Sequence, residues 1–595
     1  LYTMSQYAGI MRYDKSNGEK IGIQPQPDEG EAALRWNWDS PLIISPHNTE
    51  RLYFAANFLF QSDDRGDTWR KISPELTRDE DRNKMKVMGK VWSVDAIFKN
   101  VFTSPLGTIV ALDESRLQKG FLVVGTDDGL VRLSRDNGLS WEKHEDFPGV
   151  PKKAYVTDVI TSKHDINTIY VSFNYHKYGD FSPYLVVTKD GGKTWRSISS
   201  NIPINNFIWT VVEDHINPKI LFVGTEFGMY FSLDGGISWS EFEEVPTIPI
   251  RDLEIHEGED DLVAASFGRG FYIVDDYSPL REYSKSIENK TAHLFSVKSA
   301  SQYIVAAPEK SATGHNFFTS PNPPFGIKLS YFLGENVLSK YERRQEIENT
   351  KFRRGETIDY PTALNLEDEA KEKLPKIYLT ITDMDGKIVR RINSGRGKGY
   401  HENYWDLRTF SMRNIEDEES FSGPLVPPGK YRVHLEKFEN NTIEKLTEKQ
   451  TFRINQVGSK SSQEDRLVLY EFQLKFDKLI ADVNKLVDNI NKSIDHVDSD
   501  INKSLNSLSN LDLEMLNKKR GDFMDLKMIF TGTRNLNYAD VFSGSPPSVQ
   551  RRLGNMSWEL SNTTSKPTNT HIKTYNISKN KYDQVISKFE SLKAN

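Results

Sequence analysis

An eight-residue pattern occurs four times in the first 240 residues and constrains the fold more than any other feature of this sequence. The pattern is [Ser/Thr]-x-Asp-x-Gly-x-[Ser/Thr]-Trp, and it occupies residues 62–69, 134–141, 188–195 and 232–239. Its aspartates, at positions 64, 136, 190 and 234, lie 72, 54 and 44 residues apart. Recurrence at this spacing is typical of a repeat architecture. We call each copy a box.

The residue types of a box suit a tight turn. An aspartate can accept hydrogen bonds from turn amides, the glycine tolerates a positive φ, and the tryptophan can cover the turn with an apolar face. Apolar runs at 121–124, 184–187 and 220–223 flank the boxes and predict strands. Short antiparallel sheets repeated about every 45 residues are typical of β-propeller blades. The residues to which we assign this structural role are Asp64, Gly66, Trp69, Asp136, Gly138, Trp141, Asp190, Gly192, Trp195, Asp234, Gly236 and Trp239.

The box resembles the Asp-box (BNR) repeat of sialidases, sortilin-type VPS10 domains and family 74 glycoside hydrolases. Five further stretches resemble a group of large bacterial exported proteins described as VPS10/sortilin-like or as BNR-repeat glycosyl hydrolases; they are 35–41, 44–48, 125–130, 224–228 and 267–276. The resemblance implies a propeller in an exported protein, located in the periplasm, on the cell surface or in the medium. It implies no particular function, because one fold hosts many.

Length and composition narrow the class of protein. The 595 residues predict about three domains. A net charge of −7 without a long basic run argues against nucleic acid as a partner. The absence of cysteine excludes disulfides and thiolate metal sites. Sortilin receptors carry a Cys-rich module after the propeller, so their ligand-sorting role is not transferred to this chain. The sequence contains no apolar run of about 18 residues, so no membrane span is predicted.

Residues 1–282 are predicted to form the propeller blades. A partial unit opens the chain, and further units follow at 38–75, 92–146, 152–199, 205–245 and 250–278. The opening stretch 8–19 is a degenerate relative of the repeat without its tryptophan, and the sequence shows neither a start methionine nor a signal peptide. We therefore expect an incomplete ring and a propeller portion upstream of this chain.

Two further regions are predicted after the blades. Residues 283–311 form a connector with an edge strand at 292–295, and residues 312–456 form an all-β domain that resembles the FlgD-type immunoglobulin-like sandwich. Asp385-Gly386 predicts a hairpin turn in that domain, and its charged insertion at 334–374 is predicted to be a mobile loop.

The last region, residues 462–595, is predicted to be helical. Apolar residues recur every three or four positions from Phe472 to Leu508, which predicts one long amphipathic helix or two in line. They recur again from Tyr582 to Leu592, and helices are also predicted at 511–530 and 547–560. The expected arrangement is an antiparallel helical hairpin or bundle that serves as a structural clamp.

Two carboxylates are the candidates for catalysis. A glycosidase needs a pair of carboxylates across a cleft. Asp128 and Glu226, with Asp127, occupy equivalent blade positions in Gly-Thr-Asp-Asp-Gly and Gly-Thr-Glu-Phe-Gly. The alternative is that this pattern is another repeated turn. The family 74 enzymes also place two propellers around their cleft, whereas this chain shows at most one.

Aromatic residues in two stretches outside the repeat are the candidates for ligand binding, because function tends to lie on loops. One stretch contains Trp36 and Trp38, and the other contains Tyr175, His176 and Asp180. Such side chains suit sugar stacking or a protein hot spot, although packing between blades is the alternative for the two tryptophans. His176 has no second ligand at metal-binding spacing, so we predict no metal and no cofactor. The Arg-Ile-Pro signature of sialidases is absent from the blades, which argues against that activity.

Three hypotheses follow. The first is a non-catalytic exported or cell-surface scaffold whose propeller binds a protein or a glycan, while the sandwich and the helices hold it in a larger assembly. The second is a glycan hydrolase that uses Asp128 and Glu226. The third is one part of a two-part propeller that is active only when completed.

Overall fold

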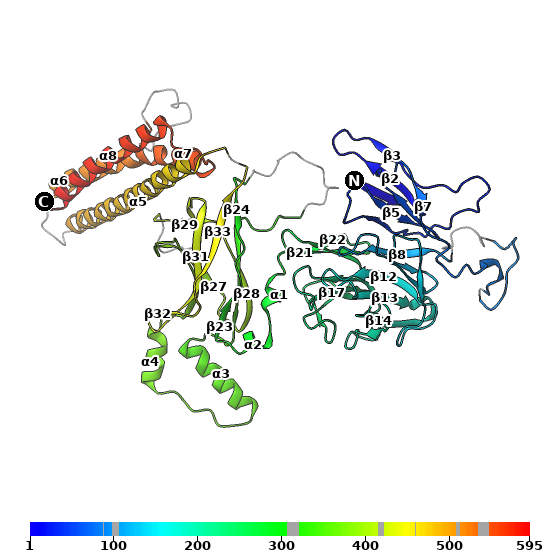
Figure 1. Ribbon diagram of the computed structural model, residues 1–595. Helices are drawn as coiled ribbons and strands as arrows, with labels where there is room; N and C mark the ends of the chain where they lie inside the picture. Colours follow the sequence, from blue (N-terminus) through cyan, green and yellow to red (C-terminus); the bar gives the residue numbers. More distant parts are fainter. Residues whose placement is uncertain are drawn as a thin grey trace. The chain divides into compact units, whose positions relative to one another are not determined.

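The chain is mainly β, with small sheets and a helical C-terminal region (Figure 1). The computed structural model describes residues 1–86, 88–97, 106–305, 320–413, 422–458, 460–506, 512–532 and 547–594. It contains two compact units, Leu1–Tyr283 (unit 1) and Ser284–Asn595 (unit 2).

Unit 1 consists of six antiparallel sheets that follow one another along the chain. Four sheets have four strands (β4–β7, β8–β11, β12–β15 and β16–β19), and the sheets at either end of the series have three (β1–β3 and β20–β22). The strands are β1 Tyr2–Ser5, β2 Gly9–Tyr13, β3 Lys20–Gly22, β4 Leu42–Ile44, β5 Leu52–Ala55, β6 Leu59–Ser62, β7 Arg70–Lys71, β8 Ile109–Glu114, β9 Leu122–Thr126, β10 Val131–Ser134, β11 Glu142–His144, β12 Tyr155–Thr161, β13 Ile169–Tyr175, β14 Asp180–Thr188, β15 Arg196–Ser197, β16 Ile208–Glu213, β17 Leu221–Thr225, β18 Gly228–Ser232, β19 Ser240–Glu241, β20 Ile250–His256, β21 Asp261–Ser266 and β22 Phe271–Val274. Two 3-10 turns, η1 Arg82–Lys84 and η2 His176–Tyr178, lie between strands.

The last sheet ends after three strands. Where the four-stranded sheets continue into a box and a fourth strand, the chain after β22 turns into the short helix α1 (Pro279–Glu282). Pro279 suits the first turn of a helix because it lacks the amide hydrogen that a strand would use. Arg281 then holds this segment to the sheets, since its guanidinium lies 2.7 Å from both Asp214 and Asp260.

Each box forms the predicted turn, with the aspartate at its centre. The Asp190 carboxylate accepts hydrogen bonds from the Thr188 hydroxyl (2.8 Å), the Thr194 amide (2.8 Å) and the Thr194 hydroxyl (2.6 Å). The same three bonds recur in the other boxes. These donors lower the pKa of Asp64 and of Asp190 to about 2.

The boxes also join each sheet to the one before it. Gly138 has φ 87°, and a Cβ atom there would lie 2.5 Å from the carbonyl oxygen of Ile72 in the preceding sheet. At the other box glycines a Cβ atom would meet side-chain atoms near the preceding sheet, at 2.5 Å from Ile23 for Gly66 and 2.9 Å from Leu133 and Ile198 for Gly192 and Gly236. The Trp69 and Trp239 indoles donate to carbonyls of the preceding sheets, each at 2.7 Å. Buried apolar clusters fill all five interfaces between successive sheets.

Unit 2 opens with the short helix α2 (Lys285–Glu288) and a β region of two main sheets around one apolar core. One sheet has the order β23-β25-β28, and the other has the order β24-β33-β31-β26-β27, with β32 on β31. Leu329 and Trp405 of the first sheet share this core with Leu379 of the second. The strands are β23 Ala292–Leu294, β24 Ala300–Gln302, β25 Ile327–Leu333, β26 Lys376–Thr382, β27 Ile388–Ser394, β28 Gly399–Trp405, β29 Arg408–Phe410, β30 Ser422–Leu425, β31 Gly429–Glu439, β32 Thr442–Lys445 and β33 Gln450–Gln456.

The predicted edge strand at 292–295 is confirmed as β23, and the turn at Asp385-Gly386 joins β26 to β27. The connector contributes more than an edge strand, because β24 also joins a sheet, as the parallel neighbour of β33.

The charged insertion at 334–374 was predicted as a mobile loop, and this prediction is wrong. The insertion contains the helices α3 (Lys340–Arg353) and α4 (Ala363–Lys371). Neither helix has a buried residue, so polar contacts stabilise them. Ser339 and Glu342 form a capping box at the start of α3, and Arg344 of α3 lies 2.8 Å from Glu369 of α4.

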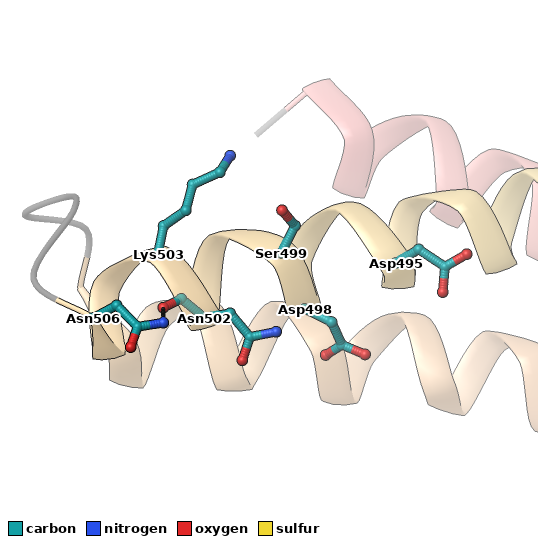
Figure 2. Close-up of a pocket in the computed structure, with 6 residues that line it drawn as sticks. All are labelled: Asp495, Asp498, Ser499, Asn502, Lys503 and Asn506. Carbon is teal, nitrogen blue, oxygen red and sulfur yellow. Dashed lines mark hydrogen bonds between the residues drawn. The ribbon is translucent and has the colours of Figure 1, made fainter.

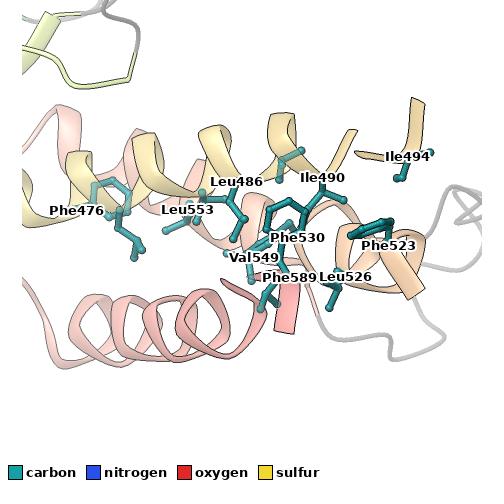
Figure 3. Packing of buried hydrophobic residues seen from close by; sticks show 14 of the residues in the cluster. Phe476, Leu486, Ile490, Ile494, Phe523, Leu526, Phe530, Val549, Leu553 and Phe589 are labelled. Carbon is teal, nitrogen blue, oxygen red and sulfur yellow. The ribbon is translucent and has the colours of Figure 1, made fainter. Parts of the chain in front are cut away.

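Four helices complete unit 2: α5 (Gln463–Leu505), α6 (Leu513–Thr531), α7 (Val549–Ser561) and α8 (Asn569–Ala594). The apolar stripe read from the sequence is a single 43-residue helix, α5, and all four helices contact one another. Phe476, Ile490, Phe523, Phe530 and Phe589 belong to the core of this bundle (Figure 3). Asp477 joins α5 to the β region, because its carboxylate accepts from the Met412 amide (2.7 Å) and from Arg413 (2.5 Å).

We predict that Gly138→Ala destabilises unit 1 more than Gly149→Ala does. Both glycines have a positive φ, but only a Cβ at position 138 would meet backbone of a neighbouring sheet, since nothing lies within 4 Å at position 149. The control should lose about 1 kcal/mol from the free energy of unfolding and Gly138→Ala about 2–4 kcal/mol. Denaturant unfolding of the full chain measures both, and equal losses would contradict the proposed seating of the box.

We also predict that Asp190→Asn lowers the melting temperature of unit 1 at neutral pH and much less at pH 2. The native pKa of about 2 lies below the ordinary 3.8, so the ionised carboxylate stabilises the fold above about pH 4 and loses this effect as the pH falls toward 2. Calorimetry across this range should show the wild type and the variant converging at low pH. Asp146→Asn is the control, because the 73% exposed Asp146 side chain lies outside every box; an equal loss in that variant would argue against a special role for the box.

Candidate functional site

A β-bulge at the same place in four neighbouring strands shapes one end of unit 1. The strands β8, β12, β16 and β20 are each the first strand of their sheet, and each has a register shift after its first residues. In β16 the residue skipped by the pairing is Trp209, and in β20 it is Arg251. Bulges redirect side chains and are common next to functional sites.

The bulged residues Trp209 and Arg251 belong to a chain of ring contacts that crosses three sheets. The Arg251 guanidinium lies 3.5 Å from the centroid of the Trp209 ring and 5.5 Å from that of Phe267. Trp209 packs edge-on against Phe207 (4.8 Å), and His176 stacks on Phe207 at 5.0 Å. We call His176, Phe181, Phe207, Trp209, Glu226, Arg251 and Phe267 the bulge cluster.

The bulge cluster lies where the first strands of the sheets start and the second strands end. Trp209 and Arg251 are near the starts of β16 and β20, whereas His176, Glu226 and Phe267 directly follow β13, β17 and β21. Antiparallel pairing brings these positions to the same end of neighbouring sheets. Phe267 is 69% exposed and Phe181 is 44% exposed, so the cluster exposes apolar rings to solvent.

The charges of the bulge cluster influence one another. Burial lowers the pKa of Arg251, while Asp39 and Glu226 act in the opposite direction. Burial also lowers the pKa of His176, and the nearby positive charges of Lys177 and Arg251 lower it further. Glu226 accepts a hydrogen bond of 3.0 Å from the Trp209 indole, which orients that ring.

A small pocket of about 130 Å³ is lined by Tyr155, Tyr175, Tyr178 and Lys177, together with Asp127, Asp128 and others. The rings of Tyr175 and Tyr178 stack with centroids 4.3 Å apart. The volume is below the range of about 300–1,000 Å³ that is usual for small-molecule sites. The pocket therefore suits a single side chain or part of a sugar better than a whole small molecule.

The two predicted catalytic carboxylates are both engaged by protein groups. Asp128 is 3% exposed and accepts from the Arg78 amide (2.8 Å) and the Thr126 hydroxyl (2.5 Å). Glu226 orients Trp209 as described above. The neighbouring Asp127 accepts from the amides of Gly107 and Thr108 and from the Thr108 hydroxyl, and burial raises its pKa to about 6.

The predicted ligand-binding residues occupy different surroundings. Trp36 stacks on Phe54 with centroids 4.9 Å apart and packs between the first two sheets, whereas Trp38 is 43% exposed and contacts Tyr7. Tyr175 lines the small pocket and His176 lies in the bulge cluster. Asp180 is held by its own hairpin, because it accepts from the Tyr184 hydroxyl at 2.6 Å.

Trp209, Arg251 and Phe267 were not predicted as site residues from the sequence. The only signal was positional: Ile208-Trp209-Thr210 and Ile250-Arg251-Asp252 begin equivalent strands, and a large residue follows the first apolar one in each. Alternation of apolar residues does not show a bulge, so the pattern alone did not place these side chains together.

A second pocket lies on the helical bundle and is a weaker candidate for a ligand site. It has a volume of about 420 Å³ and is lined by Asp495, Asp498, Ser499, Asn502, Lys503 and Asn506 (Figure 2). All six residues belong to α5 or its C-cap, and Asp498 pairs with Arg520 at 2.6 Å. This is a polar stretch of helix surface.

Among the residues that the structure describes, no group of three or more His, Asp or Glu side chains is placed to hold a metal ion. None of the helices formed by these residues is both long enough and apolar enough to cross a membrane.

Comparison with known proteins found similarity only to solved structures. No protein-family model matches the chain, and no curated protein matches it. The GH74 xyloglucanase from Xanthomonas campestris is 18% identical with a TM-score of 0.34, over 47% of this chain and 43% of that chain, so this chain spans less than half of that enzyme's length. PorZ, a surface component of the type-IX secretion system of Porphyromonas gingivalis, is 12% identical with a TM-score of 0.34, over 76% and 56%. YCF48 from Cyanidioschyzon merolae is 12% identical with a TM-score of 0.31, over 46% and 76%. Similarity at this level assigns no function.

We predict that the pKa of His176 responds to its charged neighbours. Lys177→Ala should raise this pKa by removing a positive charge, and Glu226→Gln should lower it by removing a negative one. NMR titration of histidine-labelled protein measures both shifts, with His176→Gln to assign the signal. Lys189→Ala, in the third box, is the control; a pKa of His176 that is the same in all variants would contradict the described electrostatics.

Proposed function

We propose that this chain is a non-catalytic binding protein whose bulge cluster recognises a protein or glycan partner. The observation that carries the proposal is the continuous contact of Trp209, Arg251 and Phe267 across neighbouring sheets, with Phe267 largely exposed. Tryptophan, tyrosine and arginine are the residues that most often dominate binding energy at protein interfaces, and aromatic rings also stack on sugars.

The wider setting of this binding protein is part of the proposal. The box repeats and their resemblance to VPS10/sortilin-like and BNR-repeat proteins support a propeller in an exported or cell-surface protein. Three-stranded sheets at both ends of a four-stranded series support the inference that a further propeller portion completes the ring. Unit 2, with its proposed immunoglobulin-like sandwich and its helical clamp, would hold the propeller in a larger assembly.

A family 74-like glycoside hydrolase is the second candidate function. One observation favours it: burial raises the pKa of Asp127, next to Asp128, to about 6, and a raised carboxyl pKa is a property of general acids. Against it, Asp127 and Asp128 accept hydrogen bonds from their own turn and its neighbours, as described above. We therefore favour binding without hydrolysis.

Trp209→Ala is expected to reduce binding of the partner at least about tenfold, because it removes the ring that supports Arg251. Immobilised glycan and peptide arrays probed with the labelled full chain measure this loss. Trp558→Ala is the matched control, since Trp558 is 76% exposed but lies on the helical bundle. Binding that depends on Trp558 and not on Trp209 would contradict the proposal.

The hydrolase candidate has its own test. Incubation of the wild type with xyloglucan and other β-glucans, followed by a reducing-end assay, is expected to show no turnover. Turnover that Asp128→Asn or Glu226→Gln abolishes, with the fold intact, would establish the hydrolase instead.

A further inference from the structure

Arg251 is a partly buried cation without a polar partner among the residues that the structure describes. Its guanidinium contacts two aromatic rings, but it forms no hydrogen bond and no ion pair within that set. Two other partly buried arginines of unit 1 are paired with carboxylates: Arg281 with Asp214 and Asp260, and Arg78 with Glu145. Arg251 therefore differs from these arginines, since no described residue occupies its donors.

The contact with the Trp209 ring does not use those donors. The guanidinium lies 3.5 Å from the Trp209 centroid, so the ring supports its flat face, and the N–H groups are at its edge. A guanidinium edge matches a carboxylate with two parallel hydrogen bonds. Asp39 and Glu226 are near enough to influence the pKa of Arg251, but neither forms an ion pair with it.

A second cation lies at the same end of unit 1. The ammonium group of Lys177 contacts the ring of Tyr155 at 5.7 Å and has no ion pair with a described carboxylate. Lys177 and Arg251 both act on His176, so the three groups occupy one region. The bulge cluster thus has two cations without an ion pair to a described residue, Arg251 within it and Lys177 beside it, together with exposed apolar rings and the carboxylates of Glu226 and the nearby Asp39.

We propose that the bulge cluster binds an acidic polypeptide segment, with a carboxylate of the segment paired to Arg251 and flanking apolar side chains covering Phe181 and Phe267. This inference rests on the proposed binding function and specifies its ligand. The carboxylate belongs either to an Asp or Glu side chain or to the C-terminus of the segment, since both have the same chemistry. Pairing offsets the cost of a partly buried, unpaired guanidinium, which gives the ligand carboxylate a larger effect here than on an open surface.

The exposed rings favour a polypeptide over an acidic glycan. Phe181, Phe227 and Phe267 are 44%, 47% and 69% exposed, and a phenylalanine ring has no polar group to bond sugar hydroxyls. Exposed phenylalanines beside an arginine are typical of the apolar centre of a protein interface.

The test uses the full chain and immobilised 15-residue peptides that share one set of apolar flanking sequences. Three series have Glu, Gln or Lys at the centre and an amidated C-terminus; a fourth has Gln at the centre and a free C-terminal carboxylate. Polygalacturonate is the acidic glycan probe. The proteins are the wild type, Arg251→Gln, Arg251→Lys, Trp209→Ala and the control Arg135→Gln. Arg135 stacks on Phe121 at 4.1 Å but lies in a box.

The wild type and Arg135→Gln are expected to bind the Glu series, or the free-carboxylate series, at least about tenfold more tightly than the amidated Gln series. Arg251→Gln should abolish this preference, and Arg251→Lys should keep part of it because it keeps the charge but loses the planar fork. Whichever acidic series is preferred identifies the source of the carboxylate. Thermal melts confirm the fold, and Arg251→Lys decides the case if Arg251→Gln does not fold.

The test distinguishes a failure of this inference from a failure of the proposed function. A preference for acidic peptides that persists in Arg251→Gln, or peptide binding without acidic preference that Trp209→Ala still abolishes, would overturn this inference and leave the proposed function intact. Retention of polygalacturonate alone, lost in Trp209→Ala, would replace the polypeptide with an acidic glycan. No binding of any probe by the wild type, or binding unaffected by both Trp209→Ala and Arg251→Gln, would contradict the inference and the proposed function together.

Discussion

The hydrogen-bonded aspartate of the box is the interaction on which unit 1 depends. It closes the turn before the fourth strand, and the adjoining glycine then fits against the preceding sheet, where a side chain would meet Ile72 or its counterparts. Local turn chemistry and packing between sheets are therefore coupled in eight residues. Repetition of this coupling builds a series of sheets whose first strands lie next to one another.

The bulges place side chains that the repeated pattern does not account for. A regular first strand would alternate its side chains between two sheet interfaces, whereas the extra residue in β16 and β20 belongs to neither pattern. Trp209 and Arg251 occupy these extra positions, so they add to the site without removing a residue from the interface cores. The box contacts and the residues proposed for recognition thus lie at separate positions of the same sheets.

The sequence predicts best those features that are determined by residues close together in the chain. The boxes, the hairpin at Asp385-Gly386 and the long helix α5 follow from residues close together in the chain, and all were predicted. The helices α3 and α4 were missed because neither buries an apolar face, although Ser339-x-x-Glu342 is a capping-box signal. The relation of the β region to immunoglobulin-like sandwiches stays a prediction.

The candidate site was predicted only in part. The stretch that contains Tyr175, His176 and Asp180 was selected for its aromatic composition, and its His176 lies in the bulge cluster with the adjoining Phe181. Arg251 and Trp209 were not selected, because their meeting depends on bulges in strands 42 residues apart in sequence. The conspicuous carboxylates Asp128 and Glu226 have structural hydrogen bonds instead. Repeated motifs thus identified the scaffold, whereas the proposed binding residues are the ones that the repeat does not share.

Hydroxyl-radical footprinting of the full chain, with and without a peptide or glycan selected on the arrays, tests the central claim most directly. Aromatic side chains report their own exposure in this measurement, so no substitution is needed. The account predicts that the ligand protects Phe181, Trp209 and Phe267 while Trp558 on the bundle stays reactive. Protection of Trp558, or of surfaces away from the bulge cluster, with Phe267 as reactive as before, would contradict it.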